Sequence, residues 1–167
     1  DNLGLINGEV KFSKGRLDFP QMAALYNMSD VTVNISDAEG FGLSTLESLS
    51  CGTPIIVNMT GGLQEQVTDG EEWFGIGLEP TSKAIIGSQE IPYIYEDRIN
   101  GDEFVSALET IYNMPREKRR KLGLKGQAHV NKNYNFDKHT QKWRHLLKDI
   151  HERHGSWSTR KNYKSWE

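Results

Sequence analysis

The chain lacks the features of a secreted or membrane protein. It contains a single cysteine, Cys51, which cannot form an internal disulfide, and this favours a reducing compartment. No segment approaches the roughly 20 consecutive apolar residues that a membrane-spanning helix requires. The opening residues, Asp1-Asn2, do not have the basic and apolar character of a leader peptide. We therefore expect a cytoplasmic protein without a transmembrane segment.

The chain also has no excess of positive charge, and it has few prolines. Lys and Arg number 20 against 23 Asp and Glu, which gives a formal net charge of -3. Such a chain has no general positive field to neutralise a phosphate backbone, so nucleic acid is not an expected partner. With 5 prolines and 36% hydrophobic residues, the composition is that of a globular protein. At this length we expect one domain over residues 1–154 and a tail over 155–167.

The first half of the chain alternates short strands with helices. Branched and aromatic residues between polar or glycine-bearing turns predict strands at 9–12, 31–35, 54–57 and 73–78. Capping residues and apolar three-and-four spacing predict helices at about 18–29, 43–51 and 60–67. This alternation predicts an α/β fold, a Rossmann-like parallel sheet flanked by helices.

The second half is expected to be mainly helical. Residues 80–98 follow neither the strand nor the helix period, so we expect an irregular segment there. A helix should then begin after Gly101 with Asp102 as its cap. Two more helices follow, and the last should span about 136–154 with four apolar side chains facing inward: Trp143, Leu146, Leu147 and Ile150. The basic cluster at 116–120 is interpreted as the solvated face of a surface helix.

One segment combines two glycines with two glutamates between a predicted strand and a predicted helix. It reads Glu39-Gly40-Phe41-Gly42-Leu43-Ser44-Thr45-Leu46-Glu47. In an open parallel sheet, helix amino termini at the carboxyl ends of the strands present unpaired N–H groups that suit a diphosphate. Glu47 could accept from a ribose diol, and Glu39 could reach a sugar hydroxyl. On local residues alone, a capped helix after a strand turn fits the segment equally well.

This segment resembles the signature of retaining GT-B glycosyltransferases, the glycosyl transferases group 1 family. Its continuation, residues 50–57 followed by Gly61-Gly62-Leu63-Gln64-Glu65, is similar to the family's next strand and Gly-Gly loop. Leu25-Tyr26 before Ser29-Asp30-Val31 is similar to the family's passage from helix to strand. The resemblance covers residues 9–78 well and the helices after Gly101 loosely. It implies the donor-binding half of a GT-B fold.

The resemblance also implies a role for each residue of the motif. Glu39 would be catalytic and contact the transferred sugar, while Glu47 would bind the ribose of the donor. The donor-binding loop would comprise Gly40, Phe41, Gly42, Leu43, Ser44 and Thr45, with the amides of 41–44 holding the diphosphate. No cofactor is implied, because the nucleotide-diphosphate sugar is itself the donor substrate. The chain has no Asp-x-Asp pair, which agrees with a metal-independent reaction that retains anomeric configuration.

The sequence departs from the family pattern in two places. The family's basic pair, an Arg and a Lys, would precede residue 1, so we expect an N-terminally truncated piece that is inactive without its acceptor domain. Lys14 or Arg16 would instead lie at the edge of the base-binding region. Residues 80–98 are interpreted as an insertion that shapes donor or acceptor choice.

Other reactive side chains give weaker signals. Five histidines lie on the polar helical tail and are expected at the surface: His129, His139, His145, His151 and His154. Cys51 is interpreted as a small buried residue at a helix end rather than a nucleophile. Two alternatives to sugar transfer remain open. One is an epimerase or phosphorylase on the same architecture, and the other is a non-catalytic binding or scaffold module.

Overall fold

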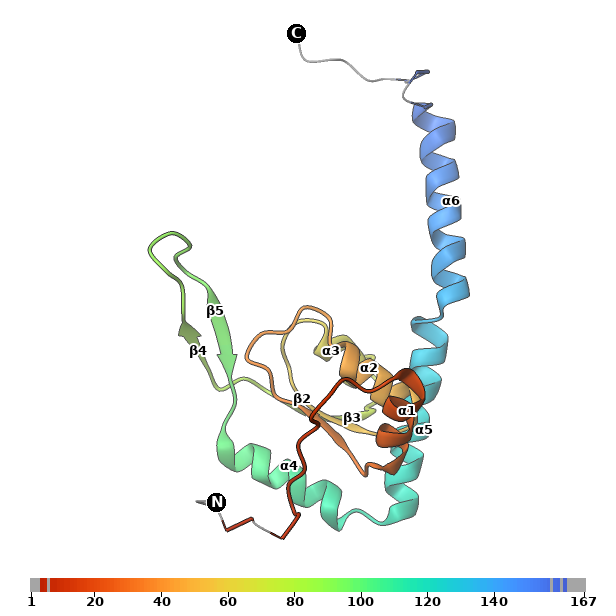
Figure 1. The fold of residues 1–167 in the computed structure, drawn as a ribbon. Coiled ribbons are helices and arrows are strands. Elements are labelled where there is room, and N and C mark those ends of the chain that lie inside the picture. The colour runs from red at the N-terminus through yellow and green to blue at the C-terminus, as the bar shows by residue number, and fades with distance from the viewer. Residues whose placement is uncertain (1–3, 6, 157, 160, 162–167) are drawn as a thin grey trace.

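A computed structural model describes residues 4–5, 7–156, 158–159 and 161, and its centre is a three-stranded parallel sheet (Figure 1). The strands are β1 (Thr32–Asn34), β2 (Ile55–Asn58) and β3 (Gly75–Leu78), in that spatial order. Ile56 of β2 lies beside Val33 and Ile76 of its neighbours. All four residues of β2 are buried, as expected for a strand covered on both faces. The predicted α/β class is confirmed.

Helices cover both faces of this sheet. The described helices are α1 (Phe19–Met28), α2 (Leu43–Ser50), α3 (Leu63–Val67), α4 (Gly101–Asn113), α5 (Arg116–Asn133) and α6 (Phe136–His154), of which α6 takes no part in this covering. On one face, Ile55 and Val57 pack in a cluster with residues of α2, α3 and α5. On the other face, Ile56 packs with Ala107 and Ile111 of α4. The alternation of side chains along β2 therefore separates two hydrophobic layers.

The helix starts differ in how they are capped. Asp18 caps α1, accepting from the Gln21 amide at 2.9 Å while the Gln21 side chain accepts from the Asp18 amide. The prediction that Asp102 caps α4 is wrong, because Asn100 accepts from the Asp102 amide at 2.8 Å. Helix α2 has no side-chain cap at all, and its first position is preceded by left-handed Gly42.

Residues 9–12 do not form the predicted strand. Val10 and Phe12 are 46% and 84% exposed, and the segment runs without a neighbouring strand among the described residues. Alternating side chains stabilise a strand only when a neighbour completes the backbone ladder and covers one face. The alternation in residues 9–12 was therefore insufficient to predict a strand.

Residues 80–98 are not irregular, because they contain an antiparallel hairpin. Strands β4 (Ser82–Ile85) and β5 (Tyr95–Arg98) pair with Ser82 opposite Arg98. The hairpin stands away from the main sheet (Figure 1). Its base is tied to the loop after β1, since the Asp97 amide donates to the Asp37 carbonyl at 2.8 Å. Because no layer of the described chain covers either face of the hairpin, its sequence carries no simple polar and apolar alternation.

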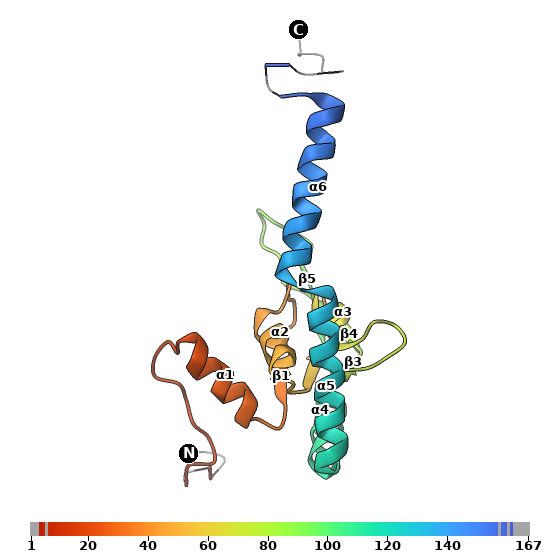
Figure 2. The same ribbon diagram turned by 90° about the vertical axis from the view of Figure 1, so that its right-hand side faces the viewer.

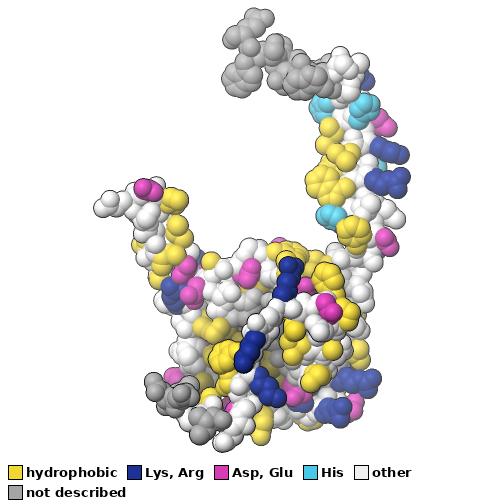
Figure 3. Space-filling view, in the orientation of Figure 1, with side chains coloured by type: hydrophobic (Ala, Val, Ile, Leu, Met, Phe, Trp, Pro, Cys, Tyr) yellow, Lys and Arg dark blue, Asp and Glu magenta, His cyan; other side chains and the backbone are white. Residues whose placement is uncertain are grey.

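Helix α6 extends from the body rather than packing on it (Figures 1 and 2). The four side chains expected to face inward do share one side of this helix, but they are 44% to 57% exposed: Trp143, Leu146, Leu147 and Ile150. Apolar side chains are seen along one side of α6 in Figure 3. The predicted burial is therefore wrong for the described chain, in which no α6 residue is buried. None of the described helices is long and apolar enough to cross a membrane.

Candidate functional site

The glycine motif lies at the carboxyl edge of the parallel sheet. Residues 35–42 connect β1 to α2, and residues 59–62 connect β2 to α3. Because β1 and β2 are parallel neighbours, both connections meet at the same edge. The sequence placed the motif there correctly.

Glycines allow these two connections to touch backbone to backbone. A Cβ on Gly61 would overlap the Glu39 carbonyl oxygen, and a Cβ on Gly62 would lie 2.8 Å from the Phe41 carbonyl oxygen. Gly42 has φ +84°, and a Cβ there would lie 2.5 Å from Leu63 Cδ2. A Cβ on Gly40 would meet nothing within 4 Å. The motif is thus fixed on its inner side and open at Gly40.

A buried amide side chain also holds the motif. Gln66 is fully buried, and its Nε2 donates to the Phe41 carbonyl at 2.5 Å while its Oε1 accepts from the Thr45 hydroxyl at 2.6 Å. Thr45 is itself 0% exposed, so neither its side chain nor its backbone is open to a ligand in this structure. Sequence reasoning missed Gln66. The signal that could have identified Gln66 as buried was its position with Leu63 and Val67 on the inner face of a short helix.

The amino terminus of α2 presents free donors. Gly42 offers no side-chain cap, and the amides of the exposed residues Leu43 and Ser44 have no protein acceptor among the described residues. Leu43 is 67% exposed. The first turn of a helix leaves such N–H groups unpaired and carries a partial positive charge. An anion placed beyond this turn would meet both the unpaired N–H groups and the partial positive charge.

Glu47 lies on the side of α2 that faces α1. Its Oε2 accepts from the Tyr26 hydroxyl at 3.1 Å, beside a cavity of about 190 Å³ between the two helices. Burial and the Glu47 carboxylate raise the pKa of Tyr26 to about 12, so the phenol remains a donor at neutral pH. Tyr26 was named from the sequence only as part of the passage from helix to strand. Its partner identifies it as the group that positions Glu47.

Glu39 lies at the other end of the motif, in the loop. Asn34 Nδ2 donates to Glu39 Oε2 at 3.4 Å, and Asn34 Oδ1 accepts from the Ser36 hydroxyl at 2.7 Å. The Asn58 amide supports the same turn, donating to the Ser36 carbonyl at 2.9 Å. Asn58 is fully buried, and its Oδ1 has no hydrogen-bond partner within the described ranges. Polar groups at the ends of β1 and β2 therefore orient the segment that carries Glu39.

Lys14 and Arg16 lie outside this cluster. Both are exposed in the extended segment before α1, and neither forms an ion pair or hydrogen bond with the motif among the described residues. Their assignment to the base edge stays a prediction.

The expectation of surface histidines is wrong for His129. This residue of α5 is 8% exposed, its Nε2 lies 3.1 Å from the Glu65 carbonyl oxygen, and its ring stacks on Phe74 at 4.4 Å. The other four histidines are exposed on α6. Cys51 is partly buried rather than buried, and desolvation followed by the Glu47 charge raises the pKa of its thiol. A raised pKa disfavours the thiolate, so Cys51 is a poor nucleophile.

Comparison with known proteins associates this geometry with one family. The family model described as "Glycosyl transferases group 1" matches residues 5–129, most of the chain. A D-inositol 3-phosphate glycosyltransferase of Thermomonospora curvata is 43% identical over 68 residues, which is 40% of this chain and 16% of that protein. An N-acetyl-alpha-D-glucosaminyl L-malate synthase of Bacillus anthracis is 28% identical over 98 residues, 59% of this chain and 25% of that protein.

A solved structure is similar over most of the chain. Sucrose-phosphate synthase from Thermosynechococcus elongatus superimposes with a TM-score of 0.65 and 25% sequence identity. The similarity covers 83% of this chain and 29% of that protein. The chain therefore spans less than a third of the length of each of these three proteins.

Proposed function

Because the chain belongs to the glycosyl transferases group 1 family, we propose that it is the donor-binding domain of a sugar-transferring enzyme. The donor would be a nucleotide-diphosphate sugar, the acceptor a hydroxyl group, and the anomeric configuration would be retained. One observation carries the proposal: unpaired amides at the start of α2 lie between two glutamates at the carboxyl edge of the sheet.

The diphosphate of the donor would lie against Gly40 and the first turn of α2. Open space at Gly40 lets the backbone approach a bulky anion. Negative charge grows on the departing diphosphate as the bond to the sugar breaks, so amides already aimed at that position stabilise the transition state more than the bound substrate. This helix terminus supplies positive potential directly, and we propose a reaction without a metal ion.

The two glutamates would hold the two ends of the donor. Tyr26 engages Oε2 of Glu47, which leaves the remaining lone pairs of this carboxylate to accept from the ribose hydroxyls. Glu39 would contact the transferred sugar from the loop, in the orientation that Asn34 supports. Lys14 and Arg16 would lie toward the base.

The acceptor would be held by a domain outside this chain. The relatives are much longer than the segment they share with it, and apolar side chains on α6 and on the hairpin lack partners among the described residues. A second domain lying across the carboxyl edge of the sheet would complete the site and exclude water. We therefore expect the chain alone to bind donor without transferring sugar. We also propose that the whole enzyme lies in the cytoplasm.

Calorimetric titration with UDP, GDP and ADP tests the donor site. We expect one of them to bind the wild-type chain and Glu47→Gln to weaken that binding at least about tenfold, because a hydrogen bond to a charged group is lost. Glu109→Gln removes the same charge from an exposed position on α4 and serves as the control. Equal affinities for wild type and Glu47→Gln, or an equal loss in the control, would reject the proposal.

A further inference from the structure

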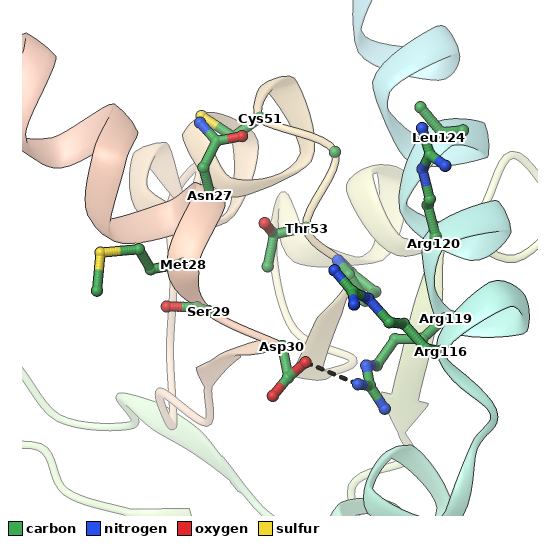
Figure 4. A pocket seen from close by; sticks show the side chains of 12 residues that line it. Asn27, Met28, Ser29, Asp30, Cys51, Thr53, Arg116, Arg119, Arg120 and Leu124 are labelled. Carbon is green, nitrogen blue, oxygen red and sulfur yellow. Dashed lines mark hydrogen bonds and ion pairs between the residues drawn. The ribbon is translucent and has the colours of Figure 1, made fainter.

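A second cavity lies at the opposite edge of the sheet from the glycine motif. It has a volume of about 550 Å³ and is lined by the turn after α1, the 51–54 turn and the start of α5 (Figure 4). Asp30 and Pro54 on its wall come shortly before β1 and directly before β2. The cavity therefore opens at the amino ends of these strands, away from the proposed donor site.

The charges lining this cavity are unbalanced. Three arginines of α5, Arg116, Arg119 and Arg120, meet a single carboxylate, that of Asp30. Arg119 is already engaged, since it pairs with Asp30 at 2.7 Å and donates to the Met114 carbonyl at 3.0 Å. Its side chain is only 18% exposed, so the interpretation of the whole cluster as a solvated face is wrong for this residue.

The other two arginines have no such partners. Within the described residues, neither Arg116 nor Arg120 forms an ion pair or a side-chain hydrogen bond. In Figure 4, Arg116 extends from α5 toward the segment with Thr53, and Arg120 runs along the helix toward Leu124. They are four residues apart in the first turns of a helix, where like charges repel and the amide dipoles disfavour cations. An anion in the cavity would relieve both effects.

The walls of the cavity are held in place by close contacts. A Cβ on Gly123 of α5 would overlap the Gly52 carbonyl oxygen, so the helix and the 51–54 turn meet at the backbone. Gln127 Nε2 donates to the Ser50 carbonyl at 2.8 Å, and the Thr53 hydroxyl donates to the Tyr26 carbonyl at 2.7 Å. A cavity with fixed walls loses little conformational freedom when a ligand enters.

We propose that this cavity binds a phosphate-bearing small molecule, with Arg116 and Arg120 as the ligands of its phosphate group. Planar guanidinium groups match phosphate oxygens in charge and in hydrogen-bond geometry. The volume falls within the ~300–1,000 Å³ usual for small-molecule sites and exceeds what one phosphate fills. Asp30, paired at the wall with Arg119, retains lone pairs that can accept from a hydroxyl on the rest of the ligand.

Amide NMR of the whole chain, titrated with inorganic phosphate and with pyrophosphate at constant ionic strength, tests this site. We expect saturable shifts at Asp30, Gly52 and residues 116–120. The double variant Arg116→Gln, Arg120→Gln should bind at least tenfold more weakly. The matched control Lys118→Gln, Lys121→Gln removes the same charge from exposed positions of α5 that do not line the cavity, and should bind as wild type does.

The following results would overturn the proposal. Shifts that grow without saturation, or an equal loss in both double variants, would show only a general charge effect. Shifts confined to residues 40–45 would place the anion at the donor site instead. The spectra also report whether each variant folds, and Arg116→Gln alone replaces the double variant if that protein does not.

Discussion

The hydroxyl of Tyr26 donates to Glu47 Oε2 at 3.1 Å, which joins the end of α1 to the middle of α2. Tyr26 is 7% exposed, so the bond is shielded on one side and open to the cavity on the other. The carboxylate that we propose binds the ribose is thus held in one orientation before any ligand binds. Such preorganisation lowers the entropy that binding must overcome.

Removal of the Tyr26 hydroxyl should weaken both stability and donor binding. Tyr26→Phe keeps the ring and deletes one hydrogen bond to a charged group, so we expect a loss of about 1–2 kcal/mol in the free energy of unfolding. Nucleotide affinity should fall several-fold because Glu47 is no longer oriented. Urea denaturation and calorimetry measure the two effects. Tyr112→Phe, at a position 85% exposed, should change neither, and an affinity unchanged by Tyr26→Phe would contradict the positioning role.

The raised pKa of Tyr26 makes a specific prediction about alkaline pH. The folded pKa is about 12, above the value of about 10 for an unfolded chain, so the unfolded state releases this proton first. The contribution of Tyr26 to stability is therefore complete below pH 10 and is lost as the pH rises toward 12. The wild type should lose unfolding free energy more steeply than Tyr26→Phe in this window. Parallel curves for the two proteins would show that Tyr26 titrates normally.

Gly40 and Gly61 should respond in opposite ways to the same substitution. Alanine at position 40 enters open space, so Gly40→Ala should keep the wild-type melting temperature while its methyl group obstructs the diphosphate. Gly61→Ala meets the Glu39 carbonyl at a φ of +49°, and we expect roughly 2 kcal/mol or more of destabilisation. Thermal melts and nucleotide titrations separate the two outcomes. Full nucleotide affinity in Gly40→Ala would argue against contact at this position.

Replacing the buried Gln66 should destabilise the protein more than replacing its neighbour Gln64. Gln66→Leu fills the same space but leaves the Phe41 carbonyl and the Thr45 hydroxyl without this partner, at a cost of about 1–3 kcal/mol. We also expect faster hydrogen exchange in residues 41–45, because the loop loses an anchor. Gln64→Leu changes an exposed residue of the same helix and is the control. Similar exchange rates in the two variants would exclude an anchoring role for Gln66.

Local signals predicted the elements around the motif because those elements depend on local chemistry. Strand β2 was expected at 54–57 and lies at Ile55–Asn58, since a branched run between turn residues suits a strand buried on both faces. The candidate site was predicted for a similar reason: Gly40, Gly42 and the two glutamates follow shortly after a predicted strand. Gln66 and Tyr26 were missed as site residues because their roles depend on partners 21 or more residues away.

The incorrect predictions share a different cause. Each depended on whether another layer of the protein covers the segment. In the described part of the chain, the 9–12 segment has alternating residues but no neighbouring strand, and residues 82–98 form a hairpin that no other layer covers. Helix α6 has an apolar side but packs it on nothing in the described chain. The prediction for His129 is wrong in the opposite sense. Helix α5 lies on the core and buries this polar residue, which the sequence pattern placed at the surface. Which surfaces meet is a property of the whole fold.

The backbone contact between Gly61 and Glu39 limits how the donor loop can respond to a ligand. With no space between these two segments, the loop cannot retreat toward α3 when a ligand binds. Adjustment is left to the side chains on its outer surface, such as Phe41, which is 44% exposed. If the proposed donor binds here, we expect closure over its sugar to come from the proposed second domain, which would move against a rigid platform.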